Sequence, residues 1–203
     1  MIWATGRPLL QFPNRSMISI VIPTRESERV LVRTLAGLVP GATAGLVREV
    51  ILADAGSQDE TAAIGDVAGC RLMVVPGPPG PRLKKAAEAA KGPWLLFVPA
   101  GSVLETGWIE DVRQFMETAP SGHAAVFGAT RPVQGGTSLW SELLALLRAR
   151  KAVLDPDRGL LIAKEFYTVL GGHRDIEATQ ADLLRRIGAK RIAVMRSGIR
   201  NPA

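Results

Sequence analysis

The feature that most constrains the fold is a short apolar run, Trp-Leu-Leu-Phe-Val at residues 94–98, which ends at Pro99 and Gly101. Helical patterns flank this run on both sides, over residues 82–91 and 108–118. A run of this length between helices is typical of a strand buried on both faces of a parallel sheet. Open α/β sheets bind ligands at the carboxyl ends of their strands, so we expect a site at the turn that begins with Pro99.

The rest of the chain repeats this alternation of apolar runs and helical patterns. We expect strands over residues 17–23, 49–53, 71–75, 94–98, 124–130, 159–163 and 191–195. We expect helices over residues 27–38, 57–68, 82–91, 108–118, 138–150, 164–170 and 179–187. A break is expected at residues 39–45, a stiff loop at residues 76–81, and a helix C-cap at Gly92. The pattern predicts an α/β fold with a Rossmann-like, mostly parallel sheet flanked by helices.

Length and composition limit what this chain can be. Its 203 residues indicate a single domain, which we place at residues 17–203 after an extended arm at residues 1–16. The single cysteine, Cys70, excludes an internal disulfide framework and fits a cytoplasmic protein. The formal net charge of +6 favours an anionic partner, such as a phosphate-bearing substrate or an anionic membrane face. No nucleic-acid-binding motif is visible, so we expect no nucleic-acid partner.

Four segments at matching intervals resemble glycosyltransferase family 2, which has the GT-A fold. They are Ile-Ser-Ile-Val-Ile-Pro-Thr-Arg-Glu at residues 18–26, Val-Ile-Leu-Ala-Asp-Ala-Gly-Ser-Gln-Asp-Glu-Thr at residues 50–61, the helix-strand-turn unit at residues 82–105, and Gly171-Gly172. The spacing is similar to that of short soluble bacterial members. The resemblance implies transfer of a sugar from a nucleoside diphosphate sugar to an acceptor that the sequence does not identify.

The resemblance also implies a donor-binding site. Asp54 ends the second strand, where its two oxygens are suited to accept hydrogen bonds from a base or ribose. Arg82 and Lys85 open a helix whose N-terminus favours a diphosphate. The substrate-binding residues expected on this basis are Pro23, Glu26, Asp54, Gly56, Arg82, Lys85, Ala100 and Gly101.

The sequence departs from the family pattern at the turn after the fourth strand. The family has an Asp-x-Asp there, whose carboxylates hold a divalent metal on the diphosphate. Here the turn reads Pro99-Ala100-Gly101 and has no carboxylate. We therefore expect neither a metal site nor a divalent cofactor. Cations would have to replace the metal, and the candidates are Arg82, Lys84, Lys85 and Arg131.

A second departure concerns the catalytic base. The family places an acidic residue at the start of the helix after the glycine pair, where it takes the proton of the acceptor hydroxyl. Depending on the register, that position is Thr179-Gln180 or Gln180-Ala181 here, and none of these side chains is a base. The nearest candidates for the role are Asp182 and His173, with Asp175 as a further one.

These two substitutions leave a second reading open. The chain is either a metal-independent glycosyltransferase or a catalytically degenerate relative that binds a nucleotide, a sugar or a partner protein. A nucleotidyltransferase of related fold ranks third, because residues 23–29 lack a glycine-rich phosphate loop. Residues 138–151 combine a leucine stripe with a terminal basic cluster, which is typical either of a packed helix or of a peripheral membrane contact near a lipid-linked acceptor.

Overall fold

The computed structural model describes residues 17–129, 154–176 and 178–201. Within these residues, one mixed sheet has the strand order β3-β2-β1-β4-β7-β6-β8-β5. Its strands are β1 Ile18–Thr24, β2 Val47–Asp54, β3 Arg71–Val74, β4 Trp94–Phe97, β5 Val103–Leu104, β6 Ala124–Ala129, β7 Leu160–Ala163 and β8 Ile192–Arg200. Strands β3, β2, β1 and β4 are mutually parallel, so their carboxyl ends form one edge. Beyond β4, the pairs β4–β7 and β7–β6 are antiparallel, and β6–β8 is parallel.

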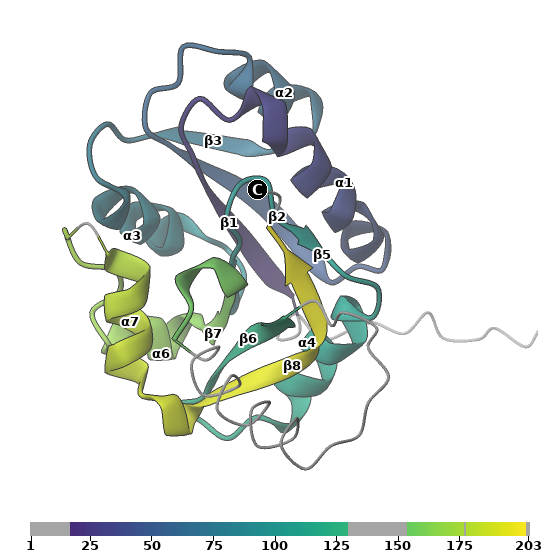
Figure 1. Cartoon of the computed structure of the whole chain (residues 1–203), viewed down its shortest axis with the longest axis vertical. Helices are drawn as coiled ribbons and strands as arrows, with labels where there is room; N and C mark the ends of the chain where they lie inside the picture. The colour runs from purple at the N-terminus through teal and green to yellow at the C-terminus, as the bar shows by residue number, and fades with distance from the viewer. Residues whose placement is uncertain (1–16, 130–153, 177, 202–203) are drawn as a thin grey trace, which may run out of the picture.

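Helices cover both faces of this sheet (Figure 1). One face carries α1 Glu28–Thr43, α2 Thr61–Val67 and α4 Trp108–Thr118. The other carries α3 Pro79–Ala89, α6 Lys164–Val169 and α7 Thr179–Ile187. Two short 3-10 turns, η2 Pro156–Arg158 and η3 Ala189–Arg191, precede β7 and β8. The α/β class with helices on both faces, and the single domain, are confirmed.

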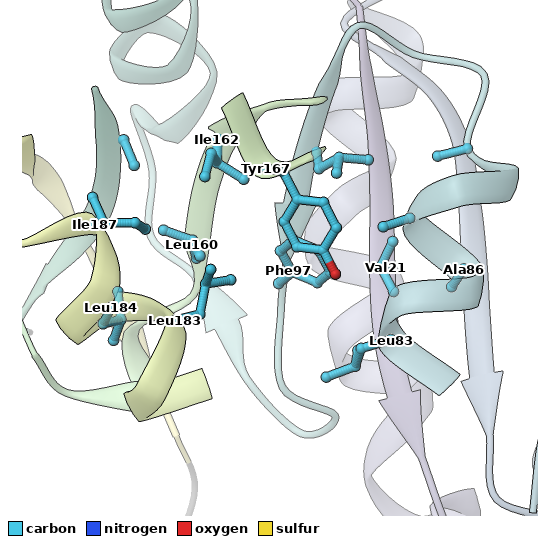
Figure 2. Packing of buried hydrophobic residues seen from close by; sticks show 14 of the residues in the cluster. Val21, Leu83, Ala86, Phe97, Leu160, Ile162, Tyr167, Leu183, Leu184 and Ile187 are labelled. Atoms are coloured by element: carbon cyan, nitrogen blue, oxygen red, sulfur yellow. The ribbon is translucent and has the colours of Figure 1, made fainter. Parts of the chain in front are cut away.

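The core has two layers, one on each side of the sheet. Alternate residues of each strand point to opposite layers, as the pleat requires. In β4, for example, Leu95 and Phe97 face α3 and α7, whereas Leu96, and Val98 just after the strand, face α1 and α4, and all four are buried. Figure 2 shows the first layer, in which Phe97 lies next to Tyr167 of α6, with Val21 and Leu83 on the α3 side. The run at residues 94–98 is thus the two-sided buried strand that the sequence predicts.

Two helices match their predicted bounds, because each has a complete apolar stripe and clear end signals. They are α4 at Trp108–Thr118 and α7 at Thr179–Ile187. The short strand β5 was not predicted. It pairs with the end of β8, which runs to Arg200 rather than ending near residue 195.

The break predicted at residues 39–45 is wrong, since α1 continues through Pro40 to Thr43. Tertiary packing explains the difference. Gly41 is buried against the Trp108 ring of α4, and a Cβ at Gly41 would lie 2.3 Å from Trp108 Cη2. Close packing of this last turn offsets the hydrogen bond that proline removes from the helix.

Both ends predicted for helix α3, at residues 82 and 91, are also wrong. Helix α3 begins at Pro79, inside the expected loop, because proline is preorganised for the first turn of a helix, where its missing N–H is not needed. The helix ends at Ala89, and the extended residue Ala90 caps it. Gly92 is not the C-cap. It lies against β1, where its N–H donates to Ser19 Oγ at 2.8 Å and a Cβ would lie 2.8 Å from Ser19 N.

Several predictions fall on residues that lie outside the described ranges. They are the arm at residues 1–16, the helix at residues 138–150 with its basic end, and Arg131. In the part of the chain that is described, no helix is long and apolar enough to cross a membrane.

Candidate functional site

A cavity of about 280 Å³ opens at the carboxyl ends of β1 and β4. This volume is near the lower end of ordinary ligand pockets, roughly 300–1,000 Å³. Its walls come from the strand ends, from α3, from η2 and from the start of α7. The lining residues are Pro23, Pro79, Leu83, Phe97, Val98, Pro99, Pro156, Asp157, Ala178, Thr179, Gln180 and Ala181. Of the residues predicted to bind substrate, only Pro23 lines this cavity.

Asp54 lies at the same edge of the sheet, at the end of β2, and is 3 % exposed. Its Oδ1 accepts hydrogen bonds from Thr24 Oγ1 at 2.8 Å and Ser57 Oγ at 2.6 Å. Its Oδ2 accepts from the N–H groups of Gly56 at 2.8 Å and Ser57 at 2.7 Å. Burial by itself raises the pKa of this carboxyl, but the hydrogen bonds from Ser57, Thr24 and Gly56 outweigh it and lower the pKa below the usual 3.8. All four acceptor positions of the carboxylate are therefore occupied within the protein.

Glu26 connects this turn to the end of β1. Its N–H donates to Ser57 Oγ at 2.9 Å, and its Oε1 accepts from the Gln58 N–H at 3.0 Å. Glu26 has a φ of 46°, which is uncommon for a residue other than glycine. The left-handed backbone and the two hydrogen bonds hold the β1 and β2 turns together. Gly56, with a φ of 96°, supplies the matching bend in the β2 turn.

Arg82 lies in the first turns of α3 and is 8 % exposed. Its Nη1 donates to the Gly77 carbonyl at 2.9 Å, while its Nε is buried and has no partner among the described residues. Burial lowers the pKa of this guanidinium, the negative charge of Asp54 raises it, and the positive charge of Arg25 lowers it. Arg82 thus joins Asp54 in one electrostatic cluster with Arg25, a residue that sequence reasoning did not assign to the site.

The other two candidate cations within the described residues, Lys84 and Lys85, have different positions. Lys85 is exposed on α3, one turn beyond Arg82. It does not line the cavity, and neither does the exposed Lys84 beside it. Along the sequence of α3, Arg82 comes between Pro79 and Leu83, and both of these residues line the cavity. The cationic side of the site is therefore the start of α3, with Arg82 as its buried charge.

The turn after β4 contains Ala100 and Gly101, the last two predicted binding residues. Gly101 has a φ of 90°, and its N–H donates to Thr34 Oγ1 of α1 at 2.9 Å. Pro99 lines the cavity at the point where the family's metal ligands would begin. Over the described ranges, no three His, Cys, Asp or Glu side chains are grouped so that they could hold a metal ion. The residues at this turn do not fit a divalent metal, because they offer no carboxylate oxygen.

His173 is 2 % exposed and lies behind the cavity wall. Its Nδ1 is 2.8 Å from the Tyr167 hydroxyl, and its Nε2 is 2.7 Å from Gln180 Oε1. The imidazole also packs edge-on against Phe97, with ring centroids 4.7 Å apart. Burial lowers the pKa of His173 to about 4, although the hydrogen bond to Gln180 Oε1 raises it, so the ring is neutral near pH 7.

Because the His173 imidazole is buried and neutral, we expect the free energy of unfolding to fall in acid. The pKa of His173 is lowered from 6.5 to about 4 in the folded state, so protonation favours the unfolded chain. The stability that the neutral ring contributes is complete above about pH 6.5 and falls by up to about 3 kcal/mol as the pH approaches 4. Among the charged groups around the ring, Arg186 opposes its protonation and Asp182 favours it. Urea unfolding between pH 7 and pH 4.5 measures the loss, and a His173→Gln variant that showed the same loss would contradict this assignment.

Asp182, the other predicted base, lies on α7 and is not among the residues that line the cavity. Its Oδ2 accepts from Arg186 Nε at 2.8 Å, and Arg174 lies 3.9 Å from its other oxygen. Arg186 in turn donates to the carbonyls of Leu170 and Gly172, each at 2.6 Å. The structure therefore places Asp182 in an ion pair that anchors the Gly171-Gly172 turn to α7.

We expect a measurable loss of stability when Gly172 in this turn is replaced by alanine. It has a φ of 68°, and a Cβ there would lie 2.9 Å from two ring carbons of Tyr167. We expect Gly172→Ala to lower the free energy of unfolding by about 2 kcal/mol or more, because left-handed backbone strain adds to a clash with a buried ring. Gly171→Ala is the matched control, since its φ is similar but a Cβ there meets nothing within 4 Å. If both variants lost the same stability, in urea unfolding, the contact with Tyr167 would be irrelevant.

Asp157 is the only carboxylate among the described residues that line the cavity, and sequence reasoning missed it. It lies on η2, more than fifty residues from the β4 turn in sequence. Its N–H donates to Asp155 Oδ1 at 3.1 Å, and its carbonyl accepts from Asn201 Nδ2 at 2.9 Å. The only available signal was Asp-Pro-Asp-Arg-Gly before a strand, which is typical of an ordinary turn.

A second hollow, of about 580 Å³, lies on the other face of the sheet between α1 and α2. It is lined by aliphatic side chains and by Cys70, whose pKa is raised by burial. This groove contains no acid, base or hydrogen-bonding cluster of its own. The chemistry therefore belongs to the edge of the sheet that carries Asp54, Arg82 and Asp157.

Comparisons with known proteins agree with this geometry. A sequence model described as Glycosyl transferase family 2 matches residues 19–175. No curated protein matches the chain. Glucosyl-3-phosphoglycerate synthase from Mycobacterium tuberculosis, solved with Mn²⁺, UDP and phosphoglyceric acid, superimposes with a TM-score of 0.68 and 23% identity over 93% of this chain and 72% of that one.

The second relative of known structure is TarS of S. aureus, residues 1–349. It superimposes with a TM-score of 0.64 and 18% identity, over 88% of this chain and 57% of that one. Identities this low establish a common fold rather than a common activity. The overall fold is therefore shared with these proteins.

Proposed function

This chain belongs to glycosyl transferase family 2, and we propose that it transfers a sugar from a nucleoside diphosphate donor to a hydroxyl group of an acceptor. Four of the similar structures contain UDP, which makes a uridine diphosphate sugar the first donor to test. The family assignment supports this reaction class, and the residues of the site support the details that follow.

The observation that carries the proposal is the buried guanidinium of Arg82. A buried charged group without a full set of partners is destabilising unless a ligand completes it. Arg82 Nε is buried and lacks a partner among the described residues, and two neighbouring residues of the same helix, Pro79 and Leu83, line the cavity. Arg82 also lies in the first turn of α3, where the positive end of the helix dipole favours a phosphate. A diphosphate oxygen is the group that would satisfy all of these features together.

We further propose that donor binding and departure of the diphosphate do not depend on a divalent metal. The M. tuberculosis synthase binds Mn²⁺ together with UDP. In this chain, the corresponding turn is Pro99-Ala100-Gly101, which offers no ligand for such an ion. Arg82 and Arg25 are the cations that the fold gathers near Asp54, and both would stabilise the negative charge that develops on the leaving diphosphate.

Asp54, Gly56 and Glu26 have a supporting role in this proposal. Since the Asp54 carboxylate is saturated by Thr24, Gly56 and Ser57, it shapes the turn on which the nucleoside would rest. Lys85 would meet the outer part of the donor, and the small residues Ala100 and Gly101 leave the β4 turn without a bulky side chain. His173 and Asp182, predicted as candidate bases, are held by hydrogen bonds inside the protein and would position the residues that line the cavity.

A catalytically inactive relative is the second candidate. It is favoured by the absence of an acidic residue both at Pro99–Gly101 and at Thr179–Ala181 in the sequence. Such a protein would bind a nucleotide, a sugar or a partner without turnover. Donor hydrolysis in the absence of an acceptor separates the two candidates, because only the enzyme releases UDP from a UDP-sugar.

A lipid-linked acceptor and peripheral contact with the inner membrane face are further proposals that rest on the sequence of residues 138–151. Their combination of leucines, Trp140 and a basic end is suited to an anionic lipid surface. Co-sedimentation with anionic liposomes at low salt tests the contact, and protein that stays in the supernatant would end it.

Titration calorimetry with a panel of nucleoside diphosphates tests the donor site. We expect UDP to bind and the affinity to fall with rising salt, because the contact is an ion pair with phosphate. Failure of every nucleoside diphosphate to bind would exclude the transferase and leave only the sugar- or partner-binding form of the second candidate.

A further inference from the structure

The side chains of Tyr167, His173 and Gln180 form one hydrogen-bonded chain that ends at the cavity. Tyr167 is 2 % exposed, and its hydroxyl lies 2.8 Å from His173 Nδ1 and 3.0 Å from the His173 backbone N. His173 Nε2 lies 2.7 Å from Gln180 Oε1, and Gln180 lines the cavity. The chain thus runs from the buried end of α6 to the first turn of α7.

The Tyr167 hydroxyl fixes the direction of every hydrogen bond in this chain. It accepts from the His173 backbone N–H, and in the described part of the protein its only other neighbour for a hydrogen bond is His173 Nδ1. If Nδ1 carried the proton, the hydroxyl would accept twice and its own hydrogen would be buried without an acceptor, at a free-energy penalty of about 1–3 kcal/mol. The hydroxyl therefore donates to Nδ1, and the imidazole proton resides on Nε2.

This tautomer determines what Gln180 presents to a ligand. Because His173 Nε2–H is a donor, it takes the Gln180 carbonyl oxygen as its acceptor. The amide nitrogen is then directed away from His173, and it has no partner among the described residues. Gln180 thus offers N–H donors at the position where relatives of this family have an acid.

Asp157 lies on the other wall of the same cavity and provides hydrogen-bond acceptors, whereas Gln180 provides donors. Its carboxylate has no hydrogen-bond partner in the described ranges, while its backbone is held by Asp155 and Asn201. Helix α7, which carries Gln180, packs against η2, which carries Asp157. A carboxylate accepts hydrogen bonds and repels anions, so it complements the donor on Gln180.

We propose that Gln180 and Asp157 form a donor–acceptor pair that selects an uncharged, hydroxyl-bearing acceptor, and that Asp157 takes the proton of the reacting hydroxyl. The inference rests on the proposed glycosyl transfer. The acceptor oxygen forms a bond to the anomeric carbon, the bond from that carbon to the diphosphate oxygen breaks, and its electron pair leaves with the diphosphate. The hydroxyl proton moves to the Asp157 carboxylate. Gln180 holds the acceptor by donating to a second oxygen of it.

Two measurements on the full chain test the pair. Nitrogen-15 labelling of histidine reports only His123 and His173, and a His123→Gln variant assigns the two sets of signals. We expect His173 to show a protonated Nε2 and an unprotonated Nδ1 at pH 7. The opposite tautomer would overturn the proposal, because Gln180 would then turn its oxygen to the cavity.

The second measurement compares two matched probes, methyl β-glucopyranoside and its uronate, which differ by one carboxylate. We expect the neutral glycoside to shift the side-chain amide signal of Gln180, and the uronate to bind at least about tenfold more weakly. Asp157→Asn should remove that difference, whereas Asp66→Asn, an equal charge change on exposed α2, should keep it. Equal binding of both probes to the native chain, or no effect of either on Gln180, would overturn the proposal.

These results are independent of the donor site. If UDP binds but the tautomer or the probe preference is wrong, only the acceptor pair fails. If the tautomer and the preference are as expected but no nucleoside diphosphate binds, the transferase proposal fails and the cavity is a sugar-binding site.

Discussion

Replacing Arg82 by methionine should weaken UDP binding at least about tenfold without lowering the free energy of unfolding. The loss follows because a charge-assisted hydrogen bond to phosphate contributes roughly 1.5–3 kcal/mol. Stability should be unchanged or higher, since methionine keeps the apolar stem and removes a buried charge whose Nε lacks a partner among the described residues. Titration calorimetry and urea unfolding of the same samples measure the two quantities.

The control for this variant is Arg33→Ala, which removes the same charge from an exposed position on α1, on the other face of the sheet. It should leave UDP affinity within about twofold, the range expected for a remote charge at physiological salt. If Arg82→Met destabilised the fold while UDP still bound, Arg82 would be a structural residue. It would then no longer support the proposed diphosphate site.

Replacing Asp54 by alanine should lower the free energy of unfolding by about 3–5 kcal/mol, among the largest effects of a single substitution in this chain. The variant leaves two hydroxyl groups and two N–H groups without their acceptor at a site that is 3 % exposed. Since the turns after β1 and β2 are joined around this carboxylate, UDP affinity should fall with stability. Urea unfolding at pH 7 is the measurement.

Acid should reproduce part of this effect in the native chain. The pKa of Asp54 is lowered from 3.8, so the stability that its charge contributes is present above pH 3.8 and is lost as the pH falls through the lowered value. Asp54→Asn should lack that component of the acid transition. An Asp54→Ala variant that lost less than about 1 kcal/mol would mean that the carboxylate is free for a ligand, as the family resemblance implies, instead of organising the turn.

The layered fold could be predicted because each of its signals is local. The two-sided apolar run of β4 and the complete stripes of α4 and α7 need no information from the rest of the chain. Errors arose where a distant contact decides the outcome. Helix α1 continues through Pro40 because Trp108 packs on its last turn, and Gly92 is a glycine because β1 passes close to it rather than because a helix ends there.

The candidate site could be predicted only in part, for the same reason. Asp54 and Arg82 could be proposed from strand and helix signals, but the sequence does not reveal that the acceptor positions of Asp54 are already filled. Asp157 reaches the cavity because antiparallel β7 returns next to β4, a pairing that no local pattern specifies. From the sequence, Gln180 appears only as the loss of a catalytic base. In the structure its oxygen is paired with His173, and we propose that its amide N–H groups donate to a ligand.

The central claim is that protein cations, not a divalent metal, hold the diphosphate at this site. It is tested most directly by titrating UDP into the native chain twice, once with EDTA and once with saturating Mn²⁺. We expect the same dissociation constant in both titrations, because the turn Pro99-Ala100-Gly101 has no carboxylate that would bind the ion. Binding of UDP that is tightened tenfold or more by Mn²⁺ would contradict it.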